Sequence, residues 1–119
     1  MFNDASSMEN VYIACGYTDL RYGIDSLAAL VKSKFALDPF QTNTLFLFCG
    51  RKRDRIKGLL WEGDGFLLLY KRLEDGKFRW PRSVDEVRKM TPQQYRWLME
   101  GLTIEPQNVV QKTLPEYPA

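Results

Sequence analysis

The sequence predicts a single α+β domain, in which an antiparallel meander sheet of about four to five strands packs with two helices. The chain has 119 residues, of which 45% are apolar, and this is enough for one packed core. Short apolar runs bounded by turn residues indicate strands, and two segments have helical periodicity instead. We expect the domain to span residues 1–105, with an extended, proline-containing tail at 106–119.

The first half of the chain alternates between strand-like and helix-like segments. Residues 10–15 are rich in strand-forming side chains and are predicted to form the first strand. From Ile24 to Phe35 the apolar residues recur at the spacing of one helical face, which predicts a helix of about three turns. Proline disfavours helical geometry at Asp38, so we expect the helix to stop there. The run "TLFLFC" at 44–49 is short and continuous, which favours a buried strand.

Two hairpin turns are predicted next, at "GDG" (63–65) and "EDGK" (74–77). A two-residue loop at the first turn places odd positions of the earlier strand beside even positions of the later one. One face is then basic in its outer half and apolar in its inner half, and it carries Arg55, Lys57, Leu59, Trp61, Phe66, Leu68, Tyr70 and Arg72. A two-residue second loop would place Arg79 opposite Arg72, with Lys77 on the same face. A three-residue first loop with a bulge would reverse the assignment.

The opposite face of this predicted sheet is the better core. It collects Ile56, Leu60, Leu67, Leu69, Leu73, Phe78 and Trp80. A second helix is predicted from the capping box of Thr91 and Gln94, with Pro92 at its first position. Trp97 lies about 200° around that helix from Tyr95, so it is expected to pack on a neighbouring loop or to contact a partner.

Cysteine and acidic residues give little indication of catalysis. Cys15 and Cys49 are too far apart to form a zinc site, and we expect two buried thiols rather than a redox pair. The chain has no histidine to act as a base and no phosphate-binding loop, so neither a cofactor nor an enzymatic activity is expected. Five carboxylates could hold a metal, as in a nuclease, although each also fits a cap or turn: Asp19, Asp25, Asp54, Glu62 and Asp64.

Positive charge is concentrated in one short segment. The net charge of the chain is only +2, yet Arg51, Lys52, Arg53, Arg55 and Lys57 face a single acid, Asp54, within residues 51–57. Such a patch attracts phosphates, and Tyr70 could stack on an unpaired base. The alternative is a solvated sheet face whose charges prevent aggregation of very apolar strands.

The sequence has no recognisable targeting or membrane segment, and this predicts a location for the protein. No apolar run approaches the roughly 18 residues of a membrane helix, and the first ten residues lack the pattern of a signal peptide. We therefore expect a cytoplasmic protein without a membrane partner.

Three stretches resemble the accessory protein, called TnpB or the second-open-reading-frame protein, of the IS66 family of bacterial insertion sequences. They are "ACGYTDLRYGIDSLAALV" (14–31), the segment 45–81 from "LFLFCG" to "KFRWP", and "MTPQQYRWLMEGLTIEPQ" (90–107). The resemblance implies a small protein encoded beside a larger, separate transposase that carries the catalytic acids. It supplies no catalytic role for any matched position.

Two hypotheses follow. In the first, a non-catalytic transposition factor binds DNA, and is nucleoid-associated when bound, through Arg51, Lys52, Arg53, Arg55, Lys57, Tyr70, Arg72 and Arg79. In the second, an adaptor docks on the transposase, or on a second copy of itself, through Leu59, Trp61, Phe66, Leu68 and Trp97.

Overall fold

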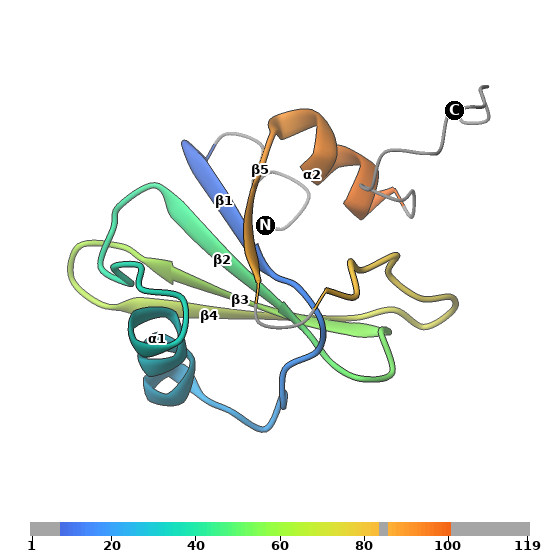
Figure 1. Ribbon diagram of the computed structural model, residues 1–119, viewed down its shortest axis with the longest axis horizontal. Coiled ribbons are helices and arrows are strands. Elements are labelled where there is room, and N and C mark those ends of the chain that lie inside the picture. Colours follow the sequence, from blue (N-terminus) through green and yellow to red (C-terminus); the bar gives the residue numbers. More distant parts are fainter. Residues whose placement is uncertain (1–7, 84–85, 101–119) are drawn as a thin grey trace.

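A computed structural model describes residues 8–83 and 86–100, so the predicted tail at 106–119 lies outside the described residues. The chain forms β1 (Asn10–Ala14), α1 (Ile24–Ser33), β2 (Thr44–Cys49), β3 (Arg55–Trp61), β4 (Phe66–Arg72), β5 (Val87–Met90) and α2 (Pro92–Met99), as Figure 1 shows. The predicted α+β class, with five strands and two helices, is confirmed.

The sheet is mixed rather than purely antiparallel. Its strand order is β4-β3-β2-β1-β5, and β2, β3 and β4 form the predicted antiparallel meander. β1 runs parallel to β2, and α1 connects the two strands. β5 adds antiparallel to the outer side of β1, at a place where the sequence predicted no strand.

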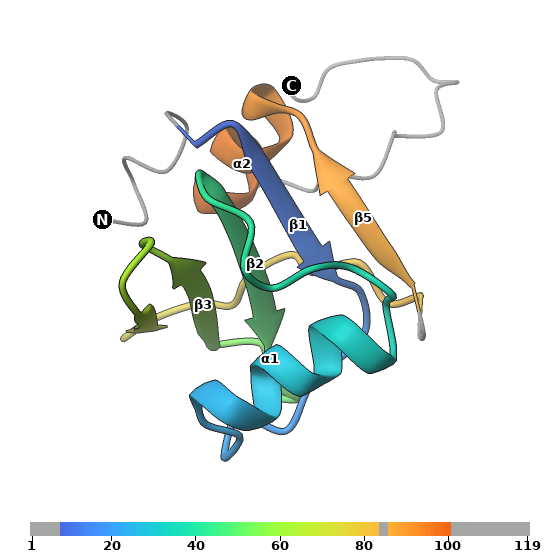
Figure 2. The ribbon, with the colours of Figure 1, turned by 90° about the vertical axis from the view of Figure 1, so that its left-hand side faces the viewer.

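Two helices cover opposite faces of the sheet (Figure 1 and Figure 2). Alternate residues of each strand therefore enter two separate cores. On the α2 side the core includes Ile13, Leu47 and Ile56, and on the α1 side it includes Phe46 and Leu59. Every residue of β2 is buried, which explains why its sequence is a continuous apolar run.

The register of β3 and β4 confirms the predicted two-residue loop. Trp61 pairs with Phe66, and the amide of Glu62 donates to the carbonyl of Gly65 (2.9 Å), which leaves Gly63 and Asp64 as the loop. Gly63 has a φ of +93°, where glycine is favoured. The predicted grouping of basic and apolar residues on one face therefore holds.

The predicted second hairpin is wrong, because residues 73–83 contain no strand. Phe78 and Trp80 are buried, as predicted for the core, but they reach it through tertiary contacts. The Phe78 amide donates to the Arg53 carbonyl (2.6 Å), and the Trp80 indole donates to the Ala14 carbonyl (2.9 Å). Arg79 consequently does not lie opposite Arg72.

Helix α2 begins where the sequence predicts, and helix α1 is shorter than predicted. The Thr91 hydroxyl accepts from the Gln94 amide (3.1 Å), and the Gln94 side chain accepts from the Thr91 amide (2.9 Å), which completes the capping box. α1 ends at Ser33, before the predicted stop at Asp38, because Ala36 takes a positive φ of 56° that reverses the chain.

Candidate nucleic-acid interface

Three connecting segments meet at one end of the sheet (Figure 1). Parallel β1 and β2 both finish there, β3 begins there and β4 finishes there. The segments are residues 15–23, 50–54 and 73–86, the last without a description of 84 and 85. Loops at the carboxyl ends of parallel strands are a common place for binding sites in α/β sheets.

Backbone hydrogen bonds join these three segments into one surface. The Thr18 amide donates to the Cys49 carbonyl (2.8 Å), and the Gly16 amide donates to the Pro81 carbonyl (2.8 Å). Gly50 lies against Leu20, so closely that a Cβ added there would be 3.1 Å from the Leu20 side chain. The surface is therefore held by the fold rather than by side-chain charges.

Cationic side chains from β3, from β4 and from two of the three segments collect at this end. We call the set the basic end, and it comprises Arg51, Lys52, Arg53, Arg55, Lys57, Arg72, Lys77, Arg79 and Arg82. The turn between β2 and β3 supplies the first three, and the segment after β4 supplies the last three. Arg82 lies outside the basic positions that the sequence predicted, because its place depends on how residues 73–83 fold.

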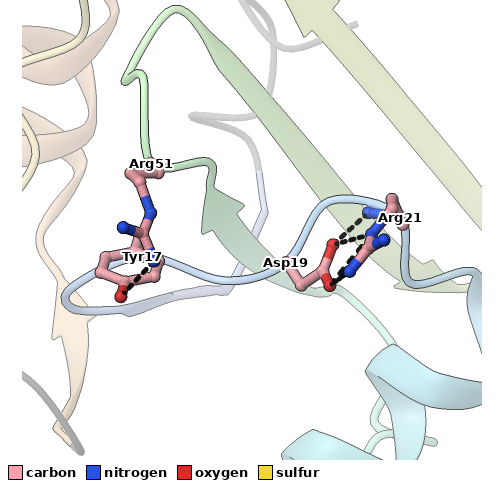
Figure 3. Close-up of polar contacts among 4 residues, drawn as sticks. All are labelled: Tyr17, Asp19, Arg21 and Arg51. Carbon is pink, nitrogen blue, oxygen red and sulfur yellow. Dashed lines mark hydrogen bonds and ion pairs between the residues drawn. The ribbon is translucent and has the colours of Figure 1, made fainter.

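Tyr17 and Arg51 form a contact between two of the segments (Figure 3). The Arg51 guanidinium carbon lies 4.3 Å from the centre of the Tyr17 ring, and its Nη2 donates to the tyrosine hydroxyl at 2.7 Å. A cation over an aromatic ring at an exposed site contributes about 0.5–1 kcal/mol. Tyr17 remains 57% exposed, so its ring is accessible beside several arginines.

Asp19 and Arg21 form a separate, self-contained pair on the loop that leads into α1 (Figure 3). The Arg21 side chain donates to both carboxylate oxygens, the shortest bond being 2.7 Å, and its backbone amide donates at 2.9 Å. These hydrogen bonds from Arg21 lower the pKa of Asp19 from 3.8 to about 2. Because its charge is matched locally, Arg21 is left out of the basic end.

The basic residues on β3 and β4 have only weak local partners. Arg55 contacts Asp54 at 3.3 Å and Arg72 contacts Glu74 at 3.3 Å, both at partly exposed positions. Exposed pairs of this kind stabilise a fold by about 0–1 kcal/mol, so a phosphate can replace the carboxylate at little cost. The Lys57 ammonium donates to the Tyr22 carbonyl (2.9 Å), which fixes its position near the loop before α1.

Most of the predicted nucleic-acid residues are brought together. Arg55 pairs with Arg72 and Lys57 pairs with Tyr70 on one face of the β3–β4 hairpin, and Tyr70 is 52% exposed. Arg79 belongs to the same end but to a different segment, where with Arg53 and Lys77 it lines a recess of about 390 Å³. The cations thus surround the end of the sheet instead of covering its face, whose centre lies under α1.

The predicted partner residues separate into buried and accessible ones. Leu59 is completely buried in the core under α1, so it has no surface to offer a partner. Trp61 and Phe66 are half-buried and form an aromatic group with Phe40, with ring centres 4.9 to 5.2 Å apart. Leu68 packs beside this core and Trp97 packs on the α2-side core.

The cysteines and the potential metal ligands do not form a reactive or metal-binding group among the described residues. Cys15 and Cys49 are both buried, as predicted, and burial raises the pKa of Cys49 to about 12. Within residues 8–83 and 86–100, no group of three or more potential metal ligands occurs.

The same residues contain no helix long and apolar enough to cross a membrane.

Comparisons with known proteins cover most of the chain. The model of a family described as "IS66 Orf2 like protein" matches residues 9–109. The uncharacterized protein y4hO of Sinorhizobium fredii (strain NBRC 101917 / NGR234) is 38% identical over 92 residues, which span 77% of this chain and 79% of the relative. The uncharacterized protein y4jC of the same strain is 35% identical over 92 residues, spanning 77% and 78%. No solved structure matches the chain.

Proposed function

The chain belongs to the IS66 Orf2-like family of insertion-sequence accessory proteins, and we propose that it serves transposition by holding the DNA of its element on the basic end. Contacts from lysine and arginine to phosphates do not depend on the base sequence of the DNA. The protein therefore binds the DNA backbone. The role is one of binding and positioning, while a separate transposase carries out the chemistry.

One observation carries this proposal: the β2–β3 turn, the segment after β4 and the adjoining ends of β3 and β4 bring their arginines and lysines to one end of the sheet. A patch whose only role is to keep strands soluble needs no such convergence, because single charges at strand edges are enough for that purpose. Arg53 adds weight, since it takes a positive φ of 64° that few residues other than glycine adopt. An arginine at this strained position is more readily explained by binding than by folding.

A matched pair of double variants tests the proposal. Fluorescence anisotropy would measure binding of element-end duplex DNA to the wild type, to Lys52→Ala with Arg53→Ala, and to Lys32→Ala with Lys89→Ala. Both variants lose two positive charges, but Lys32 and Lys89 are exposed residues of α1 and β5 that do not belong to the basic end. We expect the first variant to weaken binding at least tenfold and the second less than twofold. Equal losses would mean that only net charge matters and would refute the proposed site.

The aromatic group of Phe40, Trp61 and Phe66 supports a second candidate function, that of an adaptor that docks on the transposase. Phe40 is 52% exposed although its ring touches both partners, so an apolar surface of three rings faces solvent. It lies by the Trp61–Phe66 end of the hairpin, at the other end of the strands from Arg55 and Arg72. DNA binding and docking would therefore use different ends of the same sheet.

Capture of the purified transposase on immobilised protein tests the adaptor function. Phe40→Ser should reduce capture several-fold, because the variant replaces the most exposed of the three rings with a polar group. Tyr22→Ser is the matched control, since Tyr22 is 40% exposed but lies near Lys57. Absence of capture by the wild type, or an equal loss in both variants, would count against docking at this surface.

A further inference from the structure

A recess of about 350 Å³ lies where the three segments of the basic end meet. Its lining includes Arg51, Arg53 and Arg82, together with Tyr17, Trp80 and Pro81. The volume falls at the lower end of the range for small-ligand sites, which is about 300–1,000 Å³. The recess therefore admits a group about as large as one nucleotide, and a paired duplex is too wide to enter it.

The described residues that line this recess carry only positive charge. They include three arginines, and none of them is acidic. The neighbouring recess, of about 370 Å³, is also basic, but it contains Asp19 and Asp54, which pair with Arg21 and Arg55. Within the described chain, the side chains of Arg53 and Arg82 make no ion pair. An anion in the first recess would meet several guanidinium groups without displacing a carboxylate.

The walls of the recess are held by the fold and include a flat aromatic surface. The Gly16 amide bonds to the Pro81 carbonyl, and the buried Trp80 is fixed by its bond to the Ala14 carbonyl. Tyr17 forms one wall, with Arg51 stacked on its ring and more than half of its surface exposed. An exposed aromatic ring beside phosphate-binding cations is the arrangement that single-stranded nucleic acid uses, because its bases are free to stack.

We propose that this recess binds one unpaired nucleotide of DNA, with its phosphate at Arg51, Arg53 and Arg82 and its base against Tyr17. The proposal rests on the proposed function, because it adds a site for a single-stranded end to a surface that holds duplex DNA. It assigns to the protein a preference for DNA with unpaired nucleotides, such as the ends or junctions that arise when an element is cut out.

Binding of three matched DNA molecules tests this site. They are a blunt duplex, the same duplex with a single-stranded overhang of about five nucleotides, and that duplex with an abasic overhang of equal length. The abasic overhang keeps the phosphates but removes the bases. We expect the normal overhang to bind at least about fivefold more tightly than the blunt duplex, since one stacked base contributes about that factor or more. The abasic overhang should lose most of this gain.

Variants of the wall residues locate the effect. Tyr17→Phe keeps the ring and should keep the preference for the overhang, whereas Tyr17→Ala should abolish that preference. Arg82→Ala should weaken binding of both overhangs, and Arg96→Ala, an equal loss of charge on α2, should not.

The possible results separate the two proposals. Equal, salt-sensitive binding of all three DNA molecules would overturn the nucleotide site and leave the proposed function standing. A preference that survives both Tyr17→Ala and Arg82→Ala would place the site elsewhere and overturn this assignment. No binding to any of the three would overturn both proposals.

Discussion

Arg55 and Arg72 lie directly opposite each other on β3 and β4. Each guanidinium forms an ion pair with a carboxylate close to it in sequence. Like charges in opposite positions destabilise a sheet by up to about 1 kcal/mol. Asp54 and Glu74, each 3.3 Å from its arginine, offset part of this repulsion. The pair is therefore kept in place at some cost to stability, which is consistent with a role in binding anions.

Asp54→Asn should expose this repulsion. We expect the variant to unfold more easily by about 0.3–1 kcal/mol at low salt, and to bind DNA more tightly, because a negative charge beside Arg55 is gone. Urea unfolding at low and high salt would measure the difference in free energy, which should shrink as salt screens the two arginines. Asp64→Asn, in the exposed hairpin loop, is the control. A difference that does not depend on salt would contradict the electrostatic explanation.

Arg53 offers a test of strain at the basic end. Its φ of 64° costs roughly 1–2 kcal/mol for a residue with a Cβ, and glycine avoids this cost. Arg53→Gly should therefore be more stable than Arg53→Ala by about 1 kcal/mol in urea unfolding. Both variants should lose the same amount of DNA affinity, because both remove the guanidinium. Equal stability of the two variants would show that the position is not strained.

Asp19 gives the protein a measurable dependence on acid pH. Its pKa falls from 3.8 to about 2 on folding, so its pairing with Arg21 stabilises the fold above pH 3.8 and is lost as the pH falls towards 2. The free energies of unfolding of the wild type and Asp19→Asn should differ by a constant amount above about pH 4.5 and converge near pH 2. Urea unfolding of both proteins from pH 2 to 6 would check this. A constant difference throughout would contradict it.

Substitutions of Leu59 and Phe40 should destabilise the fold to different extents. Leu59→Ala removes a completely buried side chain and should lower the free energy of unfolding by about 2–5 kcal/mol. Phe40→Ser should lower it by only about 1 kcal/mol, because Phe40 is half exposed and contributes mainly edge contacts between rings. Thermal unfolding would compare them. A larger loss for Phe40→Ser would mean that the aromatic group belongs to the core rather than to a surface for partners.

Local signals in the sequence were sufficient for some of this architecture. The "GDG" loop predicts the register of β3 and β4, and hence which arginines share a face, because a two-residue loop allows one pairing only. Thr91 and Gln94 likewise predict where α2 begins, through hydrogen bonds between neighbours in the chain. Both predictions depend on residues only a few positions apart.

Features that depend on distant contacts could not be predicted in this way. "EDGK" has the composition of a hairpin turn, but Phe78 and Trp80 bond to Arg53 and Ala14, and these contacts override the local preference. The recess between Tyr17, Arg51 and Arg82 is also formed by residues distant in sequence, so local patterns do not predict it. The strand–helix–strand order of residues 10–49 does contain a usable signal, since parallel strands so connected bring their following loops to the same end.

The dependence of DNA affinity on salt tests the central claim most directly. Each phosphate contact contributes about −0.9 to the slope of the logarithm of the binding constant against the logarithm of salt concentration, for duplex DNA. We predict a slope steeper than about −3 for the wild type, reduced by about 2 in the variant with Lys52→Ala and Arg53→Ala. A slope near zero, or one that this variant leaves unchanged, would contradict the claim that the basic end holds DNA.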